Sequence, residues 1–244
     1  MTNTATAARP AAASQALPAR LLGILISPKD TFRSVVAYPK WFGALAVTTL
    51  LVAFFTALPM TTEAGRQATI DQQVTQMKSV GFNVTDQVYE QMERGAGRLP
   101  YMTGGSIVLM SPIIAVIIAG ILFAAFNAAM GGEAAFKQVF STVAHAGTIS
   151  AVSAIFSGAI NYLRGGVGSV ANVGALLPML PEQSFAGHLL GAIDVFLIWW
   201  IVVLAIGLGV LYRRRTQPIA IALLGLYALM AVGIAVFKSS MGGA

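Results

Sequence analysis

The stretch GHLLGAIDVFLIWWIVVLAIGLGVLYRRR, residues 187–215, indicates the fold class of the whole chain. Between residues 187 and 212 the side chains are almost all apolar or small, and Asp194 is the only acidic one. An α-helix rises about 1.5 Å per residue, so this stretch is long enough to cross the roughly 30 Å hydrocarbon core of a bilayer. Arg213, Arg214 and Arg215 then end it with three charges, which mark the cytoplasmic end of a predicted transmembrane span.

The composition of the whole chain is also typical of a membrane protein. Of its 244 residues, 57% are hydrophobic and only 10% are charged, whereas soluble domains carry about 25% charged residues. The net charge of +6 fits basic cytoplasmic segments near lipid headgroups, and the sequence contains no nucleic-acid-binding motif. The lack of cysteine excludes disulfides and thiolate ligands, and the two histidines form no zinc motif. We expect the lipid bilayer as a partner, and no nucleic acid, metal or cofactor.

Hydrophobic runs predict an all-α integral membrane protein with five transmembrane helices. The expected spans cover about residues 41–60, 104–130, 138–163, 187–212 and 219–237. Before the first span we expect a disordered tail over residues 1–19 and a cytoplasmic amphipathic segment over residues 20–40. An external helical hairpin over residues 61–103 follows the first span, and a tail over residues 239–244 ends the chain.

Two of these parts lie outside the expected spans and allow two interpretations each. In the amphipathic segment, Ser27, Pro28 and Asp30 suit the N-cap, first and third positions of a helix. That helix lies on the cytoplasmic leaflet or docks under the bundle, and the two arrangements are compatible. The hairpin over residues 61–103 is either a docking surface for a partner or a lid on the bundle.

The distribution of charge predicts the orientation. With the N-terminus in the cytoplasm, the cytoplasmic segments hold nine basic and two acidic residues, whereas the external segments hold six of each. Basic residues concentrate in the cytoplasmic loops of membrane proteins. We therefore expect the N-terminus inside, the C-terminus outside and the hairpin on the outer side.

Polar side chains within the spans form a candidate intramembrane pocket. Asp194 lies on the small-residue face of its span, about 10 Å from the outer end. Ionisable residues inside a membrane are rare and mark functional sites. Asp194 is either an ion or proton site or a structural acid hydrogen-bonded across helices. Its expected partners are Ser153, Ser157 and Asn161 in the outer half of the third span.

His145 lies in the inner half of the third span, about 10 Å along the membrane normal from Asp194. A direct hydrogen bond requires less than about 3.2 Å, so the depth argues against an Asp–His pair. Asn127, near the cytoplasmic end of the second span, matches His145 better in depth. His145 is either a functional residue or a satisfied buried histidine. Because no GxSxG motif or second intramembrane acid is present, the sequence does not support a hydrolase.

Two short motifs resemble those of a known family. They are Ser27-Pro28-Lys29-Asp30-Thr31-Phe32 and Phe136-Lys137-Gln138-Val139-Phe140, and they accompany five spans with a long loop after the first. Together they resemble the Yip family of Ypt/Rab-interacting membrane proteins, in particular its bacterial branch. The resemblance implies vesicle trafficking for eukaryotic members and, for some bacterial ones, association with ABC-type exporters. It implies no catalytic residue, and in a bacterium it implies no Rab GTPase as partner.

These observations predict a non-enzymatic, multi-pass protein of a bacterial inner membrane. We expect an accessory or scaffold subunit of a membrane complex such as an exporter, bound to another membrane protein or to a second copy of itself. A small transporter or channel that uses the polar pocket around Asp194 is the first alternative. A membrane-shaping protein is the second.

Overall fold

The chain folds into an elongated helical bundle. Its computed structural model describes residues 15–79, 81–176 and 184–241, and most of these residues are helical. Most of the predicted disordered tail over residues 1–19 lies outside the described residues, but the first helix begins within it, at Leu17. The predicted C-terminal tail likewise begins inside the last helix, which continues to Met241.

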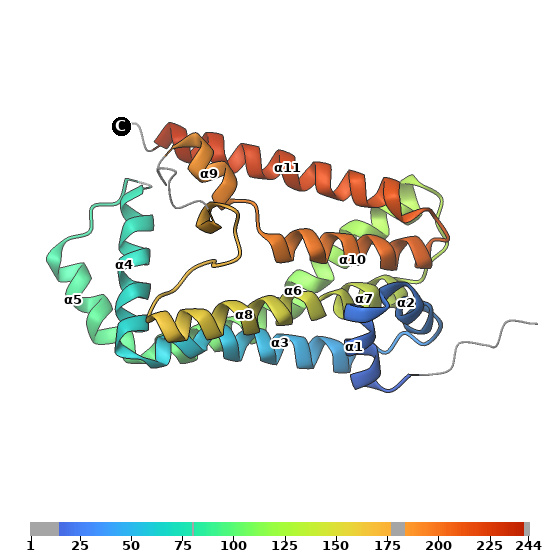
Figure 1. Cartoon of the computed structure of the whole chain (residues 1–244), viewed down its shortest axis with the longest axis horizontal. Helices are drawn as coiled ribbons and strands as arrows, with labels where there is room; N and C mark the ends of the chain where they lie inside the picture. Colours follow the sequence, from blue (N-terminus) through green and yellow to red (C-terminus); the bar gives the residue numbers. More distant parts are fainter. Residues whose placement is uncertain (1–14, 80, 177–183, 242–244) are drawn as a thin grey trace, which may run out of the picture.

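Six helices form the body of the bundle and lie roughly along its long axis (Figure 1). They are α3 (Trp41–Ala57), α6 (Leu99–Phe123), α7 (Phe136–Ala146), α8 (Thr148–Arg164), α10 (Val195–Leu211) and α11 (Thr216–Met241). The short segments η1 (Leu58–Thr61), η2 (Ala96–Arg98) and η4 (Gly174–Leu176) are 3-10 turns, and η3 (Ala124–Ala129) is π-helical.

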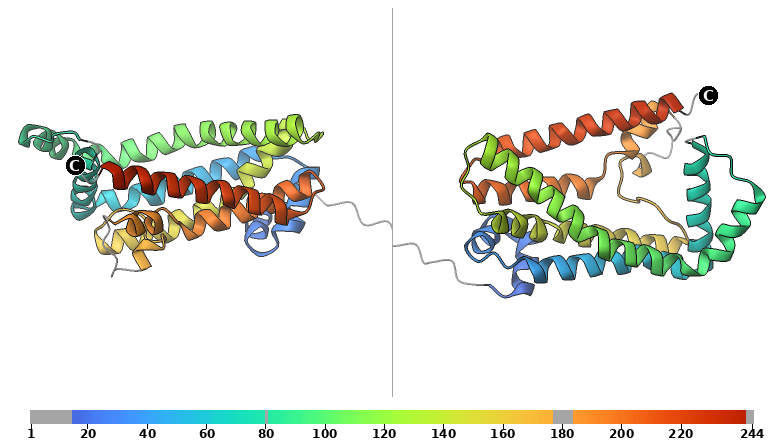
Figure 2. Two further views of the ribbon diagram at one scale, coloured as in Figure 1. Left: turned by 90° about the horizontal axis from the view of Figure 1, so that it is seen from above. Right: turned by 180° about the vertical axis from the view of Figure 1, so that it is seen from behind.

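The remaining helices lie at the two ends of the bundle, as Figures 1 and 2 show. One end carries α1 (Leu17–Ile26), α2 (Pro28–Ala37) and the turn with Arg213–Arg215 between α10 and α11. We call it the basic end. The opposite end, the hairpin end, carries α4 (Glu63–Ser79), α5 (Asp86–Gly95), α9 (Phe185–Gly191) and the end of α11. The segments predicted to share a side of the membrane therefore lie at the same end.

Within the described part of the chain, four helical stretches are long and apolar enough to cross a membrane. They are Trp41–Thr61, Asp86–Ala129, Phe136–Arg164 and Thr216–Phe237. The prediction of one continuous helix over residues 187–212 is wrong: α9 ends at Gly191, and α10, with 17 residues, begins only at Val195. A helix of 17 residues lies at the lower limit for a transmembrane span.

The tightly packed core lies near the basic end, between α2, α7 and α10. Phe32 of α2 and Leu208 of α10 are fully buried there. A Cβ atom on Gly207 would lie 2.9 Å from the ring of Phe32 and 2.5 Å from Cγ2 of Thr142, so glycine allows the helices to approach this closely. The apolar face of α2 is thus turned inward, which is the arrangement of a helix docked under the bundle.

Candidate functional site

Asp194 lies at the N-cap of α10, immediately before Val195. Its Oδ1 accepts hydrogen bonds from the backbone N–H groups of Phe196, at 2.8 Å, and Leu197, at 3.0 Å. Its Oδ2 accepts a hydrogen bond from Ser169 Oγ at 3.1 Å. The first N–H groups of a helix have no partner within the helix, and an aspartate at the N-cap satisfies them with its charge facing the positive end of the helix dipole. Asp194 therefore has a structural role at the start of α10.

The helix break before α10 has a hydrogen-bond network of its own. The backbone N–H of Asp194 donates to Tyr227 Oη of α11 at 2.9 Å, and Tyr227 Oη donates to the carbonyl oxygen of Ala192 at 2.7 Å. The N–H of Val195 donates to the carbonyl oxygen of Ala171 at 3.1 Å, within an isolated β-bridge between Asn172 and Asp194. These bonds give partners to backbone groups that the helix break leaves without an intrahelical partner.

The three expected partners of Asp194 all lie on α8. Ser153 and Ser157 are half-buried, and Asn161 is buried. Asn161 donates from Nδ2 to the carbonyl oxygen of Gly168 at 2.8 Å, in the loop whose next residue binds Asp194. The connection between Asn161 and Asp194 is therefore indirect and runs through this loop.

Asn127 belongs to a polar contact at the basic end. Its Oδ1 accepts a hydrogen bond from Tyr212 Oη at 2.8 Å, and its Nδ2 donates to the carbonyl oxygen of Ala134 at 2.7 Å. The ring of Tyr212 also stacks on Phe126, with the ring centroids 4.7 Å apart. These contacts join the end of α10, the π-helical turn η3 and the loop 130–135. The hydrogen-bond partners of Asn127 are thus Tyr212 and Ala134. His145, which the sequence placed at a similar depth, is not one of them.

His145 is fully buried in α7. Its Nδ1 lies 2.8 Å from the carbonyl oxygen of Ser141, and since a carbonyl only accepts, Nδ1 carries a proton and donates this hydrogen bond. Within the described residues, His145 Nε2, Ser141 Oγ and Arg20 Nη2 are buried without a hydrogen-bond partner. Arg20 donates to the carbonyl oxygens of Gln15 and Tyr38, and burial lowers the pKa of its guanidinium.

The three arginines at the basic end are exposed. Arg213 has φ of 52°, and it is the one non-glycine residue with positive φ in the described part of the chain. The N–H of Arg214 donates to the carbonyl oxygen of Gly209 at 2.9 Å, which closes α10 with the hydrogen bond of a Schellman motif. The position that Arg213 occupies in this motif is usually glycine.

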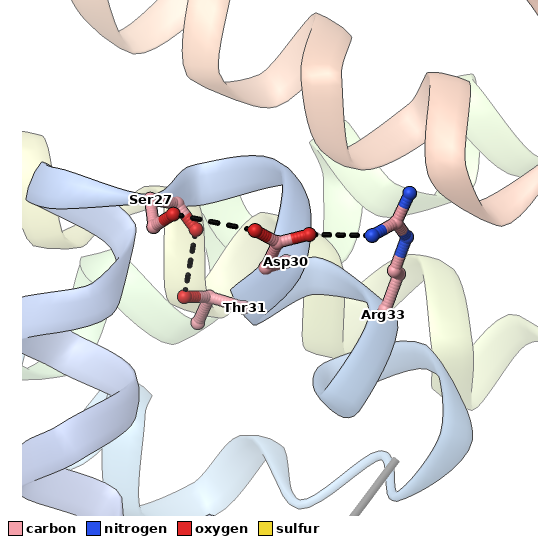
Figure 3. Close-up of polar contacts among 4 residues, drawn as sticks. All are labelled: Ser27, Asp30, Thr31 and Arg33. Carbon is pink, nitrogen blue, oxygen red and sulfur yellow. Dashed lines mark hydrogen bonds and ion pairs between the residues drawn. The ribbon is translucent and has the colours of Figure 1, made fainter. Parts of the chain in front are cut away.

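The motif at Ser27–Phe32 forms the corner between α1 and α2 (Figure 3). Thr31 Oγ1 donates to the carbonyl oxygen of Ser27 at 2.9 Å, and Asp30 accepts from Ser27 Oγ at 3.4 Å and forms an ion pair with Arg33. Thr31 also packs on α1 so closely that a Cβ atom on Gly23 would lie 2.3 Å from its Oγ1. The motif therefore forms a compact turn between the two helices.

A small cavity of about 190 Å³ lies among α3, α6, α7 and α8 and contacts Trp200 of α10. The hydroxyl-bearing residues that line it are Thr48, Thr49, Ser111 and Ser150, and none of the six residues of the predicted pocket does so. Within the described residues, no cluster of three or more histidine, cysteine, aspartate or glutamate side chains could hold a metal ion.

Sequence reasoning missed three residues that complete these contacts: Ser169, Tyr212 and Tyr227. The signal for Asp194 was present, because an aspartate directly before an apolar run fits the N-cap pattern. Tyr212 and Tyr227 are half-buried, and the hydroxyl group of such a tyrosine usually finds a hydrogen-bond partner, but the sequence does not show which one.

Comparison with known proteins identifies the family. A family model described as the Yip1 domain matches residues 22–237, which is most of the chain. No curated protein and no solved structure gave a significant match. The match covers both motifs and nearly all of the helical bundle, and it confirms the resemblance to the Yip family. The chain is a membrane protein of the Yip1 domain family.

Proposed function

We propose that the chain is a non-enzymatic accessory or scaffold subunit, which binds another integral membrane protein of a bacterial inner membrane, such as an exporter. The observation that carries the proposal is the helical hairpin of α4 and α5. It projects from one end of the bundle, and none of the residues of α5 is buried (Figures 1 and 2). In a bacterium the partner would not be a Rab GTPase.

The hairpin is firmly attached at its base and open at its tip. On α4, Ile70 is 1% exposed, and a Cβ atom on Gly65 would lie 2.0 Å from the carbonyl oxygen of Pro59. Gln67 and Tyr89 hydrogen-bond to each other, and both donate to Asp71, at 3.0 and 3.3 Å respectively. The two helices are therefore held in one arrangement, which lowers the entropy cost of binding a partner.

The tip of the hairpin offers an aromatic anchor beside an acidic helix. Phe82, in the turn between α4 and α5, is 64% exposed. Glu90 and Glu93 lie on the exposed surface of α5. Aromatic residues dominate the energy of protein interfaces, and surrounding charges guide the approach of a complementary partner. A partner with an apolar pocket and a basic rim fits this surface.

The experiment compares the retention of co-purifying membrane proteins by full-length variants, isolated in mild detergent from their native membrane. Phe82→Ser and Glu90→Lys should each lower the amount of the same partner, measured by quantitative mass spectrometry. A photocrosslinking residue placed at position 82 of the otherwise unchanged chain should capture that partner, and Glu90→Lys should weaken the capture. Glu63→Lys, which makes the same charge change at the base of the hairpin, is the matched control. If deletion of residues 72–98 leaves the association unchanged, the proposed role of the hairpin is wrong.

The two alternatives have less support. In a small transporter or channel, Asp194 would bind an ion or a proton, but its carboxylate already accepts hydrogen bonds from two backbone N–H groups and Ser169. A flux assay in liposomes with the wild type and Asp194→Asn tests this alternative, and a flux that the substitution abolishes would favour it. A membrane-shaping protein would lay residues 20–40 on the lipid surface, whereas α2 turns its apolar face to α7 and α10.

A further inference from the structure

The basic end of the bundle contains a cavity of about 470 Å³. A single water molecule needs only roughly 10–15 Å³ measured in the same way. The cavity lies between the end of α10, the loop 130–135 and α2, and its polar lining residues are Glu133, Gln138, Tyr212, Arg213 and Arg214. It is therefore large enough for a polar group of several heavy atoms.

The position of the cavity places it at the level of lipid headgroups. The apolar helix α10 ends at Leu211, η3 ends at Ala129 and α7 begins at Phe136, so three apolar segments end around it. The ends of apolar helices mark the boundary between hydrocarbon and headgroups. A group that fills this cavity can thus remain attached to acyl chains beside the bundle.

The charged side chains of the cavity are two cations and one anion. Within the described part of the chain, no ion pair engages Arg213, Arg214 or Glu133. Gln138, by contrast, is satisfied: its Oε1 accepts from the N–H of Ala135, and its Nε2 donates to the carbonyl oxygen of Val36. Guanidinium groups are well suited to phosphate oxygens, and a carboxylate accepts hydrogen bonds from an ammonium group.

The backbone holds these charged residues in a defined arrangement. Arg213 adopts φ of 52°, which is unfavourable for a residue with a Cβ atom, at a position where glycine is usual. Across the cavity, a Cβ atom on Gly132 would lie 2.6 Å from the ring of Tyr212, so the loop 130–135 packs directly on α10. Non-glycine residues in such conformations are concentrated at ligand-binding sites.

We propose that this cavity binds the headgroup of a phospholipid that carries both a phosphate and a primary ammonium group, the chemistry of phosphoethanolamine. Arg213 and Arg214 bind the phosphate oxygens, and Glu133 accepts hydrogen bonds from the ammonium group. The bound headgroup has one negative and one positive charge, so it complements all three charged side chains at once. A purely anionic headgroup would leave Glu133 unpaired beside it.

The test uses the full-length protein in detergent micelles with added phosphatidylethanolamine, phosphatidylglycerol or phosphatidylcholine, and native mass spectrometry measures the retained lipid. The wild type should retain phosphatidylethanolamine at least about tenfold more tightly than the other two, since each charge-assisted hydrogen bond is strong enough for such a ratio. The double variant Arg213→Gly/Arg214→Gln should lose this binding. Arg215→Gln, which removes a charge just outside the cavity, is the matched control and should bind as the wild type does.

Two further variants test the headgroup selectivity of the cavity and the folding of the protein separately. Glu133→Gln should bring phosphatidylethanolamine and phosphatidylglycerol to similar affinity. Arg213→Gly relieves the unfavourable backbone conformation, so lipid-free melting should not fall. If Arg215→Gln weakens binding as much as the double variant does, or if no headgroup is preferred, the proposal is overturned. Inorganic phosphate alone is added as a further ligand. If it raises the melting temperature of the protein as much as phosphatidylethanolamine does, the proposal is likewise overturned in favour of a site for soluble phosphate.

Discussion

Substitutions of Asp194 distinguish between two roles of this residue, a helix cap and an acid that binds an ion or a proton. In Asp194→Ala, the N–H groups of Phe196 and Leu197 and the hydroxyl of Ser169 lose their acceptor. Loss of an N-cap costs about 0.5–2 kcal/mol, and loss of a further hydrogen bond about 0.5–1.5 kcal/mol. We expect the free energy of unfolding to fall by about 2 kcal/mol.

Asp194→Asn is the informative comparison. Asparagine caps a helix about as well as aspartate, so its Oδ1 keeps both backbone N–H bonds, and the variant loses the attraction between the carboxylate and the helix dipole, about 0.3–1 kcal/mol. Its Nδ2 cannot accept the hydrogen bond from Ser169, but it can donate one to Ser169 Oγ instead. Ser169→Ala removes one of the three hydrogen bonds and should cost about 0.5–1.5 kcal/mol. Asp194→Ala should therefore lower the free energy of unfolding most. Asp194→Asn and Ser169→Ala should both stay closer to the wild type.

Reversible unfolding in mixed micelles measures these differences, and the fluorescence of Trp199 and Trp200 on α10 reports on them directly. An Asn variant as unstable as the Ala variant would refute the capping role, because the shape and the acceptor oxygen are retained. An unchanged Ala variant would refute it as well. A stable Asn variant that abolishes a measured flux would instead assign the carboxylate to ion or proton binding.

Other substitutions test the packing and the contacts at the basic end by the same unfolding measurement. Gly207→Ala should destabilise the protein by about 1–3 kcal/mol, because the added Cβ would lie 2.9 Å from the ring of Phe32. Gly225→Ala, where nothing lies within 4 Å of the added atom, should instead be neutral or stabilise the helix by up to about 1 kcal/mol; equal effects of the two would contradict the packing argument. Tyr212→Phe keeps the aromatic ring but loses the hydrogen bond to Asn127 Oδ1, and it should cost about 0.5–1.5 kcal/mol. No measurable loss for this variant would show that the contact does not join α10 to η3.

The features that the sequence predicted well depend on local composition. Long apolar runs predict membrane helices because every backbone group in lipid must be satisfied within its own helix. The four stretches that are long enough to span correspond to predicted spans, and the two short motifs led to the correct family. The five-span count stays a prediction from the hydrophobic runs, and the orientation stays a prediction from the charge distribution. The bacterial origin and the accessory role likewise stay predictions.

The features that the sequence predicted less well depend on contacts between distant segments. The apolar run over residues 187–212 is uniform in composition, so its length indicated one helix. The break at Asp194 forms because Tyr227 of α11 and the loop near Ser169 supply partners for the freed polar groups. Such partners lie more than 20 residues away in the sequence, and neither helical spacing nor depth reveals them.

Run length, charge and two short motifs are properties of the chain alone, and they were enough to indicate a helical membrane protein of the Yip1 domain family. The contacts of the polar residues became visible only in the folded chain. It gave Asp194 the role of a helix cap, and it brought Arg213, Arg214 and Glu133 to one cavity. The physical reason is that the role of a polar group depends on which donors, acceptors and charges surround it, and the fold brings those together from distant parts of the chain.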